Sequence, residues 1–358
     1  MVKISGPADI LGVLPHRLGF HPTESLVVIC LEGPRRRDRL VMRIDLADER
    51  YDDDVVADVV RRVQHIGATG AALVCYTDSP VDGPDVLTGP PSLPRAPLVD
   101  GVGEALADVG VEVIESVLVR RGRWYSYRPC PDESCCPPDG QPMPVEPTPA
   151  AMLYAAEAVL QGGSVLPSRE SLRRSIEPSD HAVAVAARDQ AAAVAEGRLL
   201  DVMAALGVDA ARDLTLATVH RLVQDWVDGG RELDPDDVAL VAAGLHDKRA
   251  RDEVMTLVLD HEPGLLVSLF TELARCTDDL DAAPICTVLA WAAHADGGGA
   301  LAGVAVERAL RCRPGYEMAL LVRDGLVGLV RPSAVREIAR QVRADLEREG
   351  GGAVDAAS

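Results

Sequence analysis

The chain has 358 residues, of which 47% are hydrophobic, and a formal net charge of −20. This length is enough for about two domains, and the hydrophobic fraction is that of a globular protein rather than a disordered one. The acidic balance argues against a general nucleic-acid binder, because affinity for phosphate requires clustered cations.

Residues 1–128 predict a mixed α/β domain with flanking helices. Continuous apolar runs are typical of strands covered on both faces, and one-sided apolar periodicity followed by glycine is typical of helices. The first two strands form a hairpin, and the succession strand–helix–strand favours a parallel neighbour for residues 71–76. Loops are expected at residues 15–25 and 79–97. The expected strands span residues 26–31, 40–46, 71–76, 111–119 and 123–127, and the expected helices residues 52–66 and 98–109.

A linker and a helical domain are expected next. Residues 129–149 contain eight prolines and three cysteines, which predicts a linker loop. Residues 150–349 predict an all-α domain, and residues 350–358 a disordered tail. The expected helices span residues 148–161, 168–173, 180–206, 213–227, 248–260, 263–275, 282–295, 299–312, 316–328 and 332–348, and one more begins at Asp234–Pro235.

The end of the helical domain carries a weak repeat signal. Ala302, Ala309 and Pro314 have the spacing of the small residues and the closing proline in the second helix of a tetratricopeptide unit. Only about one such unit is visible, whereas a solenoid requires several copies, so an irregular helical bundle fits equally well.

The composition predicts a cytoplasmic protein with reduced thiols. The first ten residues contain one lysine and no long apolar stretch, and apolar runs such as Leu26–Leu31 are far too short to cross a bilayer. Eight cysteines are too few for a disulfide scaffold of this length. Residues 1–149 carry a net charge of −8 and residues 150–358 one of −12, so both halves repel polyanions. We expect neither a nucleic acid nor a membrane as partner.

The first candidate site is the segment that contains Cys130, Cys135 and Cys136. Zinc requires four ligands, usually in closely spaced pairs, and the three cysteines lack this spacing. A histidine from another part of the chain, His16 or His21, would have to complete the ligand set. A disulfide between Cys130 and a later thiol is an alternative. A proline-stiffened loop with buried thiols and a packed aromatic hairpin is the structural alternative to both. The binding candidates beside these thiols are Arg123, Trp124, Tyr125 and Tyr127.

The second candidate site is the loop before the first strand. Histidine titrates near neutral pH and can act as an acid or a base. However, the loop precedes its strand, whereas ligands of open α/β sheets bind beyond the carboxyl ends of strands. A purely conformational role for glycine, proline and hydroxyl side chains is therefore the alternative. The candidates in this loop are Gly19, Phe20, His21, Pro22 and Ser25.

Three groups of motifs resemble one known family. They are Leu18–Val27 (LGFHPTESLV), Arg123–Tyr127 (RWYSY) with the following cysteines, and Leu289–Ala293 (LAWAA) with the later Arg308–Leu310 and Pro314–Tyr316. Together they resemble the actinobacterial domain-of-unknown-function family 4192, from about Ile4 to Leu329. The resemblance implies a high-GC source, in keeping with the absence of Asn and only two Lys, and a cytoplasmic protein. It implies no activity or substrate.

Three hypotheses for function remain open. Glycine-rich nucleotide motifs, a nucleophile elbow and a zinc-protease motif are all absent from the sequence, so no cofactor is expected. The first hypothesis is a non-enzymatic binding or regulatory module that binds a protein partner through its helical domain. The alternatives are an enzyme with an inter-domain site near Trp124 and Cys130–Cys136, and a thiol- or metal-dependent sensor.

Overall fold

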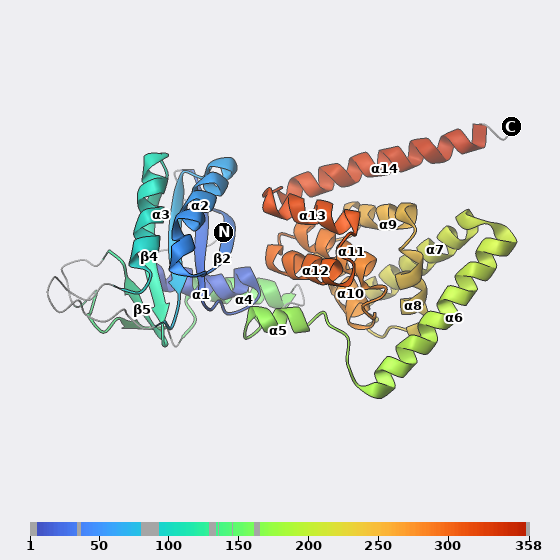
Figure 1. Cartoon of the computed structure of the whole chain (residues 1–358), viewed down its shortest axis with the longest axis horizontal. Helices are drawn as coiled ribbons and strands as arrows, with labels where there is room; N and C mark the ends of the chain where they lie inside the picture. The colour runs from blue at the N-terminus through green and yellow to red at the C-terminus, as the bar shows by residue number, and fades with distance from the viewer. Residues whose placement is uncertain are drawn as a thin grey trace. The chain divides into compact units, whose positions relative to one another are not determined.

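The computed structural model describes residues 6–33, 37–79, 93–128, 134, 136–144, 146–160 and 165–355. The chain divides into two compact units, Met1–Leu160 with Ser164–Arg169, and Gln161–Gly163 with Glu170–Ser358. The first unit contains a sheet with helices, and the described part of the second consists of helices (Figure 1). The predicted succession of an α/β and a helical region is confirmed.

A six-stranded mixed sheet, with strand order β2-β1-β3-β4-β5-β6, forms the first unit. β1 pairs antiparallel with β2 and β3, whereas β3 and β4 are parallel. The predicted hairpin and the parallel neighbour of residues 71–76 are therefore both confirmed. The strands are β1 (Ser25–Glu32), β2 (Arg37–Asp45), β3 (Gly70–Tyr76), β4 (Glu112–Arg120), β5 (Arg123–Ser126) and β6 (Gln141–Pro142).

Helices α2 (Asp52–Ile66) and α3 (Ala96–Asp108) follow the predicted bounds closely and pack against each other. Helix α1 (Pro7–Leu18) was not expected, and it includes the start of the predicted loop 15–25. Pro15 lies inside α1, where a missing amide hydrogen and a steric clash cost about 3 kcal/mol. Burial of five apolar residues of α1, each worth about 1.5–3 kcal/mol, offsets this cost.

The boundary between the two units lies later in the sequence than the predicted linker. β6 lies within segment 129–149 and pairs with β5, so this segment contributes to the sheet of the first unit. Helix α4 (Pro149–Leu160) packs against α1, with the Arg17 guanidinium 6.0 Å from the centre of the Tyr154 ring. The sequence places the domain boundary at residues 129–149, whereas the contacts place it near residues 160–170.

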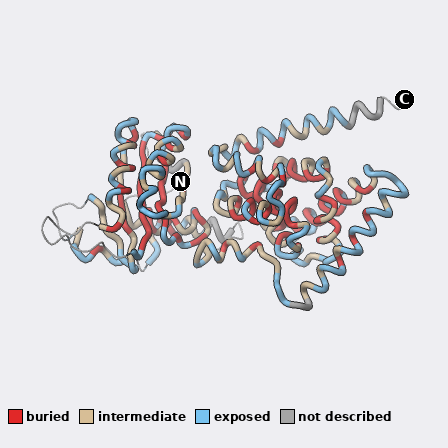
Figure 2. The backbone as a smooth tube through the Cα atoms, viewed as in Figure 1, coloured by how far each residue is buried: buried red, intermediate tan, exposed pale blue. Residues whose placement is uncertain are grey.

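The helical unit is arranged around one enclosed helix, α11, all of whose residues are buried (Figure 2). It contacts α8, α9, α10, α12, α13 and α14. Ala302 and Ala309 are fully buried in α12, which packs along α11. The helices are α5 (Arg169–Arg174), α6 (Ala182–Leu206), α7 (Val208–Val227), α8 (Pro235–Gly244), α9 (Lys248–Met255), α10 (Pro263–Arg275), α11 (Ala282–Ala295), α12 (Gly299–Cys312), α13 (Glu317–Val327) and α14 (Pro332–Asp355).

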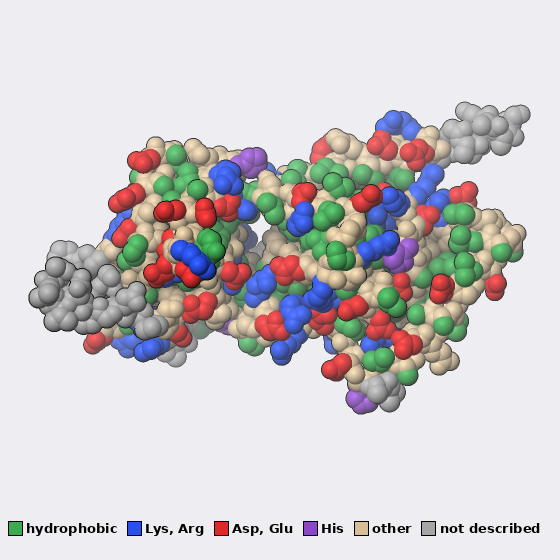
Figure 3. Space-filling view, in the orientation of Figure 1, with side chains coloured by type: hydrophobic (Ala, Val, Ile, Leu, Met, Phe, Trp, Pro, Cys, Tyr) green, Lys and Arg blue, Asp and Glu red, His purple; other side chains and the backbone are tan. Residues whose placement is uncertain are grey.

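Three helix ends differ by five or more residues from the expected ones, and α7 begins at Val208 rather than at residue 213. Residues 256–259 form a 3-10 turn after α9 instead of continuing it, and α14 extends to Asp355, into the predicted tail. No helix in the described parts of the chain is both long and apolar enough to span a membrane. Acidic and basic side chains are interspersed on the face drawn in Figure 3, in keeping with an acidity that both halves share.

Candidate functional site

The residues of the first family motif hold the start of the sheet in place. Gly19 ends α1 in the left-handed conformation (φ 78°) that favours glycine. The Leu166 amide donates to the Gly19 carbonyl (2.8 Å), and the His21 amide donates to the Leu166 carbonyl (3.0 Å). Phe20, between them, is buried, as is Pro22, whereas His21 is exposed. Gly19, Phe20 and Pro22 thus have a conformational or packing role, whereas only the backbone of His21 contributes to these contacts.

The loop nevertheless lies at the carboxyl edge of the parallel strands. Because β1 runs antiparallel to β3, the start of β1 is level with the end of β3. The Glu24 carboxylate accepts hydrogen bonds from Thr77 Oγ1 (2.8 Å) and from the Asp78 amide (2.8 Å). The argument that the loop is at the wrong edge for a ligand is therefore wrong. Ser25, the fifth candidate, is fully buried, and its hydroxyl has no hydrogen-bond partner among the described residues.

The aromatic candidates of β5 lie on both faces of the sheet. Cross-strand partners share a face, and the register places Trp124 on the face of Ser25, and Tyr125 on the opposite one with Cys75. Tyr127 donates its hydroxyl to the Pro94 carbonyl (2.7 Å). The candidates of the two family motifs therefore do not form one cluster.

Arg123 and Tyr125 order the segment that follows β5. The Arg123 guanidinium donates to the carbonyls of Asp139 (2.6 Å) and Gly140 (2.7 Å). Gly140 has φ 72°, and a Cβ there would lie 2.6 Å from the Tyr125 ring, so no other residue fits without a shift. Cys130 and Cys135 lie outside the described residues, and Cys136 is half-buried. In the described ranges no group of three His, Cys, Asp or Glu side chains is placed to hold a metal ion.

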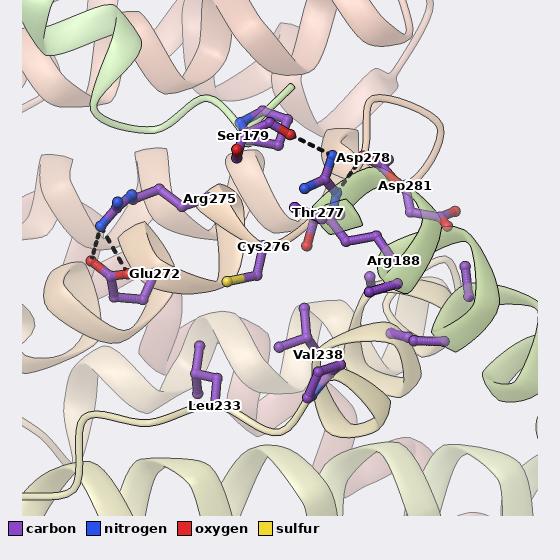
Figure 4. Close-up of a pocket in the computed structure, with 18 of the residues that line it drawn as sticks. Ser179, Arg188, Leu233, Val238, Glu272, Arg275, Cys276, Thr277, Asp278 and Asp281 are labelled. Carbon is purple, nitrogen blue, oxygen red and sulfur yellow. Dashed lines mark hydrogen bonds and ion pairs between the residues drawn. The ribbon is translucent and has the colours of Figure 1, made fainter. Parts of the chain in front are cut away.

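The helical unit contains a pocket of about 680 Å³, drawn in Figure 4. Its walls come from α6, from α8, from the end of α10 with the loop behind it, and from residues 174–179. Sites for small molecules have volumes of about 300–1,000 Å³. The pocket is thus large enough for a small organic ligand.

Small apolar side chains form the walls that α6 and α8 contribute. The two helices pack against each other, and alanine side chains leave open the space that larger residues would fill. Leu233 and Val238 point toward the same space (Figure 4). The remaining residues of these walls are Ala184, Ala187, Ala191, Ala192, Pro235, Ala239 and Ala242.

The charged residues of the rim are paired within the protein. Arg188 donates to Asp278 (2.6 Å) and to the Ser179 carbonyl (2.8 Å). Arg275 donates to both carboxylate oxygens of Glu272 (2.9 and 3.0 Å), as Figure 4 shows. The other three pairs are Arg174 with Glu170, Glu177 with Arg311, and Asp281 with His246. The charged residues that line the pocket are four acids and three bases, so the lining carries a small excess of negative charge.

A buried arginine fixes one wall of the pocket from behind. Arg308 of α12 is fully buried and donates to the carbonyls of Ile176, Ala274 (2.7 Å) and Thr277 (2.7 Å). Its Nε lies 3.5 Å from the Glu177 carboxylate. These contacts tie residues 174–179 to the end of α10, and the planar guanidinium suits three separate acceptors.

The pocket contains a thiol but no activated nucleophile. Burial raises the pKa of the Cys276 thiol above its usual value, more than the nearby Arg275 and Arg188 lower it, so the thiol is protonated at neutral pH. The Thr277 and Ser175 hydroxyls donate to the carbonyls of Leu273 (2.7 Å) and Leu172 (2.7 Å).

The fold and the pocket define a two-unit protein with an α/β sheet and a ligand-sized cavity in a helical bundle. The chain belongs to the DUF4192 family, described as a domain of unknown function, whose model matches residues 7–333. The chain matches none of the curated proteins and none of the solved structures. The resemblance seen in the motifs is confirmed for the family itself.

The pocket escapes detection in the sequence because its walls come from four separate segments. One signal was available: Arg308 lies on the same helical face as Val304 and Ala305, which are buried, and a charge on an apolar face is unusual. Its carbonyl partners are more than 30 residues away in sequence, so the periodicity does not identify them.

Proposed function

We propose that this protein is a non-enzymatic binding module whose helical unit takes an uncharged, largely apolar small molecule in the pocket between α6, α8 and α10. The supporting observation is the combination of an alanine-rich wall with a rim whose charges are paired internally. A charged ligand would leave its own charge uncompensated there, which is costly away from water. An apolar ligand gains from burial and leaves the pairs intact.

The test uses N-phenyl-1-naphthylamine, a neutral probe that fluoresces in apolar surroundings. We expect saturable binding with a Kd in the micromolar range and at least tenfold weaker binding of an anionic naphthalene sulfonate. Ala192→Phe places a ring in the pocket, because Ala192 lines it, and should weaken binding of the neutral probe at least tenfold.

Ala193→Phe is the matched control. Ala193 is the next residue of α6, is exposed and does not line the pocket. The two variants therefore carry the same change on different sides of one helix. Equal affinity of wild type and Ala192→Phe, with both variants folded by circular dichroism, would contradict the proposed site.

We infer further that the protein is cytoplasmic and of actinobacterial source, as its composition and family motifs suggest. The sensor hypothesis stays a prediction for Cys130, Cys135 and Cys136. Metal analysis and a thiol count on the purified protein test it. Absence of metal together with three reactive thiols at these positions under oxidising conditions would exclude it.

A further inference from the structure

Helix α6 has apolar residues on two opposite sides, but only one of these sides is packed. On the packed side Ala195 and Leu199 lie against Ala211 and Leu240 of the neighbouring helices. In Figure 1, α6 runs along the edge of the helical unit beside α7 and α8, and its other side is exposed in Figure 2. Some of its large apolar side chains are therefore covered by no neighbour within the described part of this unit.

The exposed side forms a continuous uncharged stripe. Residues spaced alternately by four and three positions share one side of a helix. On this stripe and at its margins the large side chains of Leu200, Val194 and Met203 are 57%, 53% and 40% exposed. We call the stripe the outer face of α6; it consists of Ala186, Gln190, Ala193, Gly197, Leu200 and Ala204.

Acidic residues flank the outer face. Asp189 and Glu196 lie along one margin and Asp201 along the other, and all three are exposed. Among the described residues none of the three has an ion-pair partner. Arg198, three residues before Asp201, lies beyond Val194, toward the packed side of the helix. The outer face thus presents uncharged surface between exposed acidic residues.

We propose that the outer face of α6 docks an amphipathic helix of a partner protein whose apolar stripe is flanked by Lys or Arg. A second copy of this chain is disfavoured, because it would bring acidic margins together between molecules that each carry a net charge of −20. The Ala and Gly side chains let the backbone of a partner helix approach closely.

The size of this face predicts a transient complex. The outer face spans residues 186–204 of α6, which is about 28 Å of helix about 10 Å wide. This corresponds to roughly 280 Å² of contact per partner, less than half of the roughly 800 Å² of a standard stable complex. We therefore expect a Kd in the micromolar range that rises with salt, since the charges that steer the complex are exposed.

The test is fluorescence anisotropy with a labelled 18-residue helical peptide of Leu and Lys in amphipathic order. A peptide of the same composition in scrambled order controls for unspecific attraction to an acidic protein, and a Leu/Glu peptide controls for charge. We expect tenfold weaker binding of the scrambled peptide and no binding of the Leu/Glu peptide.

Variants of the chain locate the contact. Leu200→Asp should weaken binding of the Leu/Lys peptide at least tenfold. Leu321→Asp is the matched control, because Leu321 is 64% exposed on α13, outside the outer face. Glu196→Lys combined with Asp201→Lys should reverse the preference toward the Leu/Glu peptide.

Three outcomes would overturn the proposal. They are equal effects of Leu200→Asp and Leu321→Asp, an unchanged preference in the double Lys variant, and a dimer of the chain that Leu200→Asp disperses. Ala192→Phe, which fills the pocket, should leave peptide binding unchanged. A failure of this proposal is therefore distinguishable from a failure of the proposed pocket.

Discussion

Helices α6 and α11 are both rich in alanine but have opposite surroundings, and α6 contains five charged residues whereas α11 contains none. Every residue of α11 is buried among six neighbouring helices, whereas α6 contacts α7 and α8 on one side and leaves Val194 and Leu200 more than half exposed. The absence of charged residues in α11 agrees with its enclosure, and the charges of α6 agree with its place at the edge of the unit. In α11 the apolar surface stabilises the fold, and in α6 the exposed apolar side chains belong to the proposed docking face.

The largest expected effect tests this difference with one substitution placed in each helix. Ala290→Glu puts a carboxylate at a fully buried position of α11 and should cost more than about 4 kcal/mol of unfolding free energy, or prevent folding. Ala193→Glu makes the same change on the outer face of α6 and should stay within about 0.5 kcal/mol. Urea unfolding followed by circular dichroism measures both. A large cost for Ala193→Glu would mean that part of this chain covers α6.

The second expected effect concerns Arg308, a charged residue that is fully buried in α12. Arg308→Met leaves three backbone carbonyls without their donor and should cost about 3–5 kcal/mol. Arg311→Met is the control, because Arg311 binds the same Glu177 from the surface and should cost less than about 1 kcal/mol. Similar losses in the two variants would show that the carbonyl contacts of Arg308 contribute little.

Local patterns in the sequence predicted the elements but not their surroundings. The bounds of α2 agree with the predicted range, because helix periodicity, an acidic first turn and a terminal glycine are local signals. Helix α1 was not predicted, and its last residues were assigned to a loop; the burial of five apolar residues stabilises it despite Pro15. Which neighbours enclose a helix depends on contacts between distant segments, which a single sequence does not contain.

The candidate sites illustrate the same limit. The motif residues Gly19 and Tyr127 were identifiable by their type, yet the structure gives them conformational roles on different parts of the sheet. The loop before β1 lies at the carboxyl edge of the sheet because β1 runs antiparallel to β3, and the sequence did not reveal this direction. The pocket was missed because its alanines have no chemical signature. Its shape results from how α6 and α8 meet.

A smaller effect tests a single hydrogen bond in the enclosed helix. Trp291 of α11 donates its indole N–H to the Met255 carbonyl (2.9 Å), in a buried position. Trp291→Phe removes the donor and should cost about 1–3 kcal/mol, measured by urea unfolding. Trp226→Phe is the control, since its partner is the Ser268 hydroxyl, which can turn to another acceptor or to water. Trp226→Phe should lose less unfolding free energy than Trp291→Phe. The reverse order would contradict the enclosed environment of α11.

The smallest expected effect is the pH dependence that α11 contributes. Burial lowers the pKa of His294, and the hydrogen bond that its Nε2 donates to the Val330 carbonyl (2.6 Å) only partly opposes this. Above the ordinary histidine pKa of about 6.5 the group is neutral in both states and has no pH effect. As the pH falls below that value, the unfolded state binds the proton first, so stability is lost until the pH passes the lower folded pKa.

His294→Gln should therefore reduce the slope with which the unfolding free energy falls just below pH 6.5. Urea titrations at closely spaced pH values measure this slope. His16 of the first unit also has a pKa lowered by burial, so the comparison is made in a His16→Gln background. Asp296 acts with the opposite sign: burial raises the pKa of its carboxyl, so its folded state gains a proton first on acidification and is stabilised. Asp296→Asn should remove this stabilisation at lower pH and leave the loss of stability caused by His294 unchanged. An unchanged slope in His294→Gln would mean that the imidazole is already hydrated in the folded state, which would contradict the enclosure of α11 near its C-terminal end.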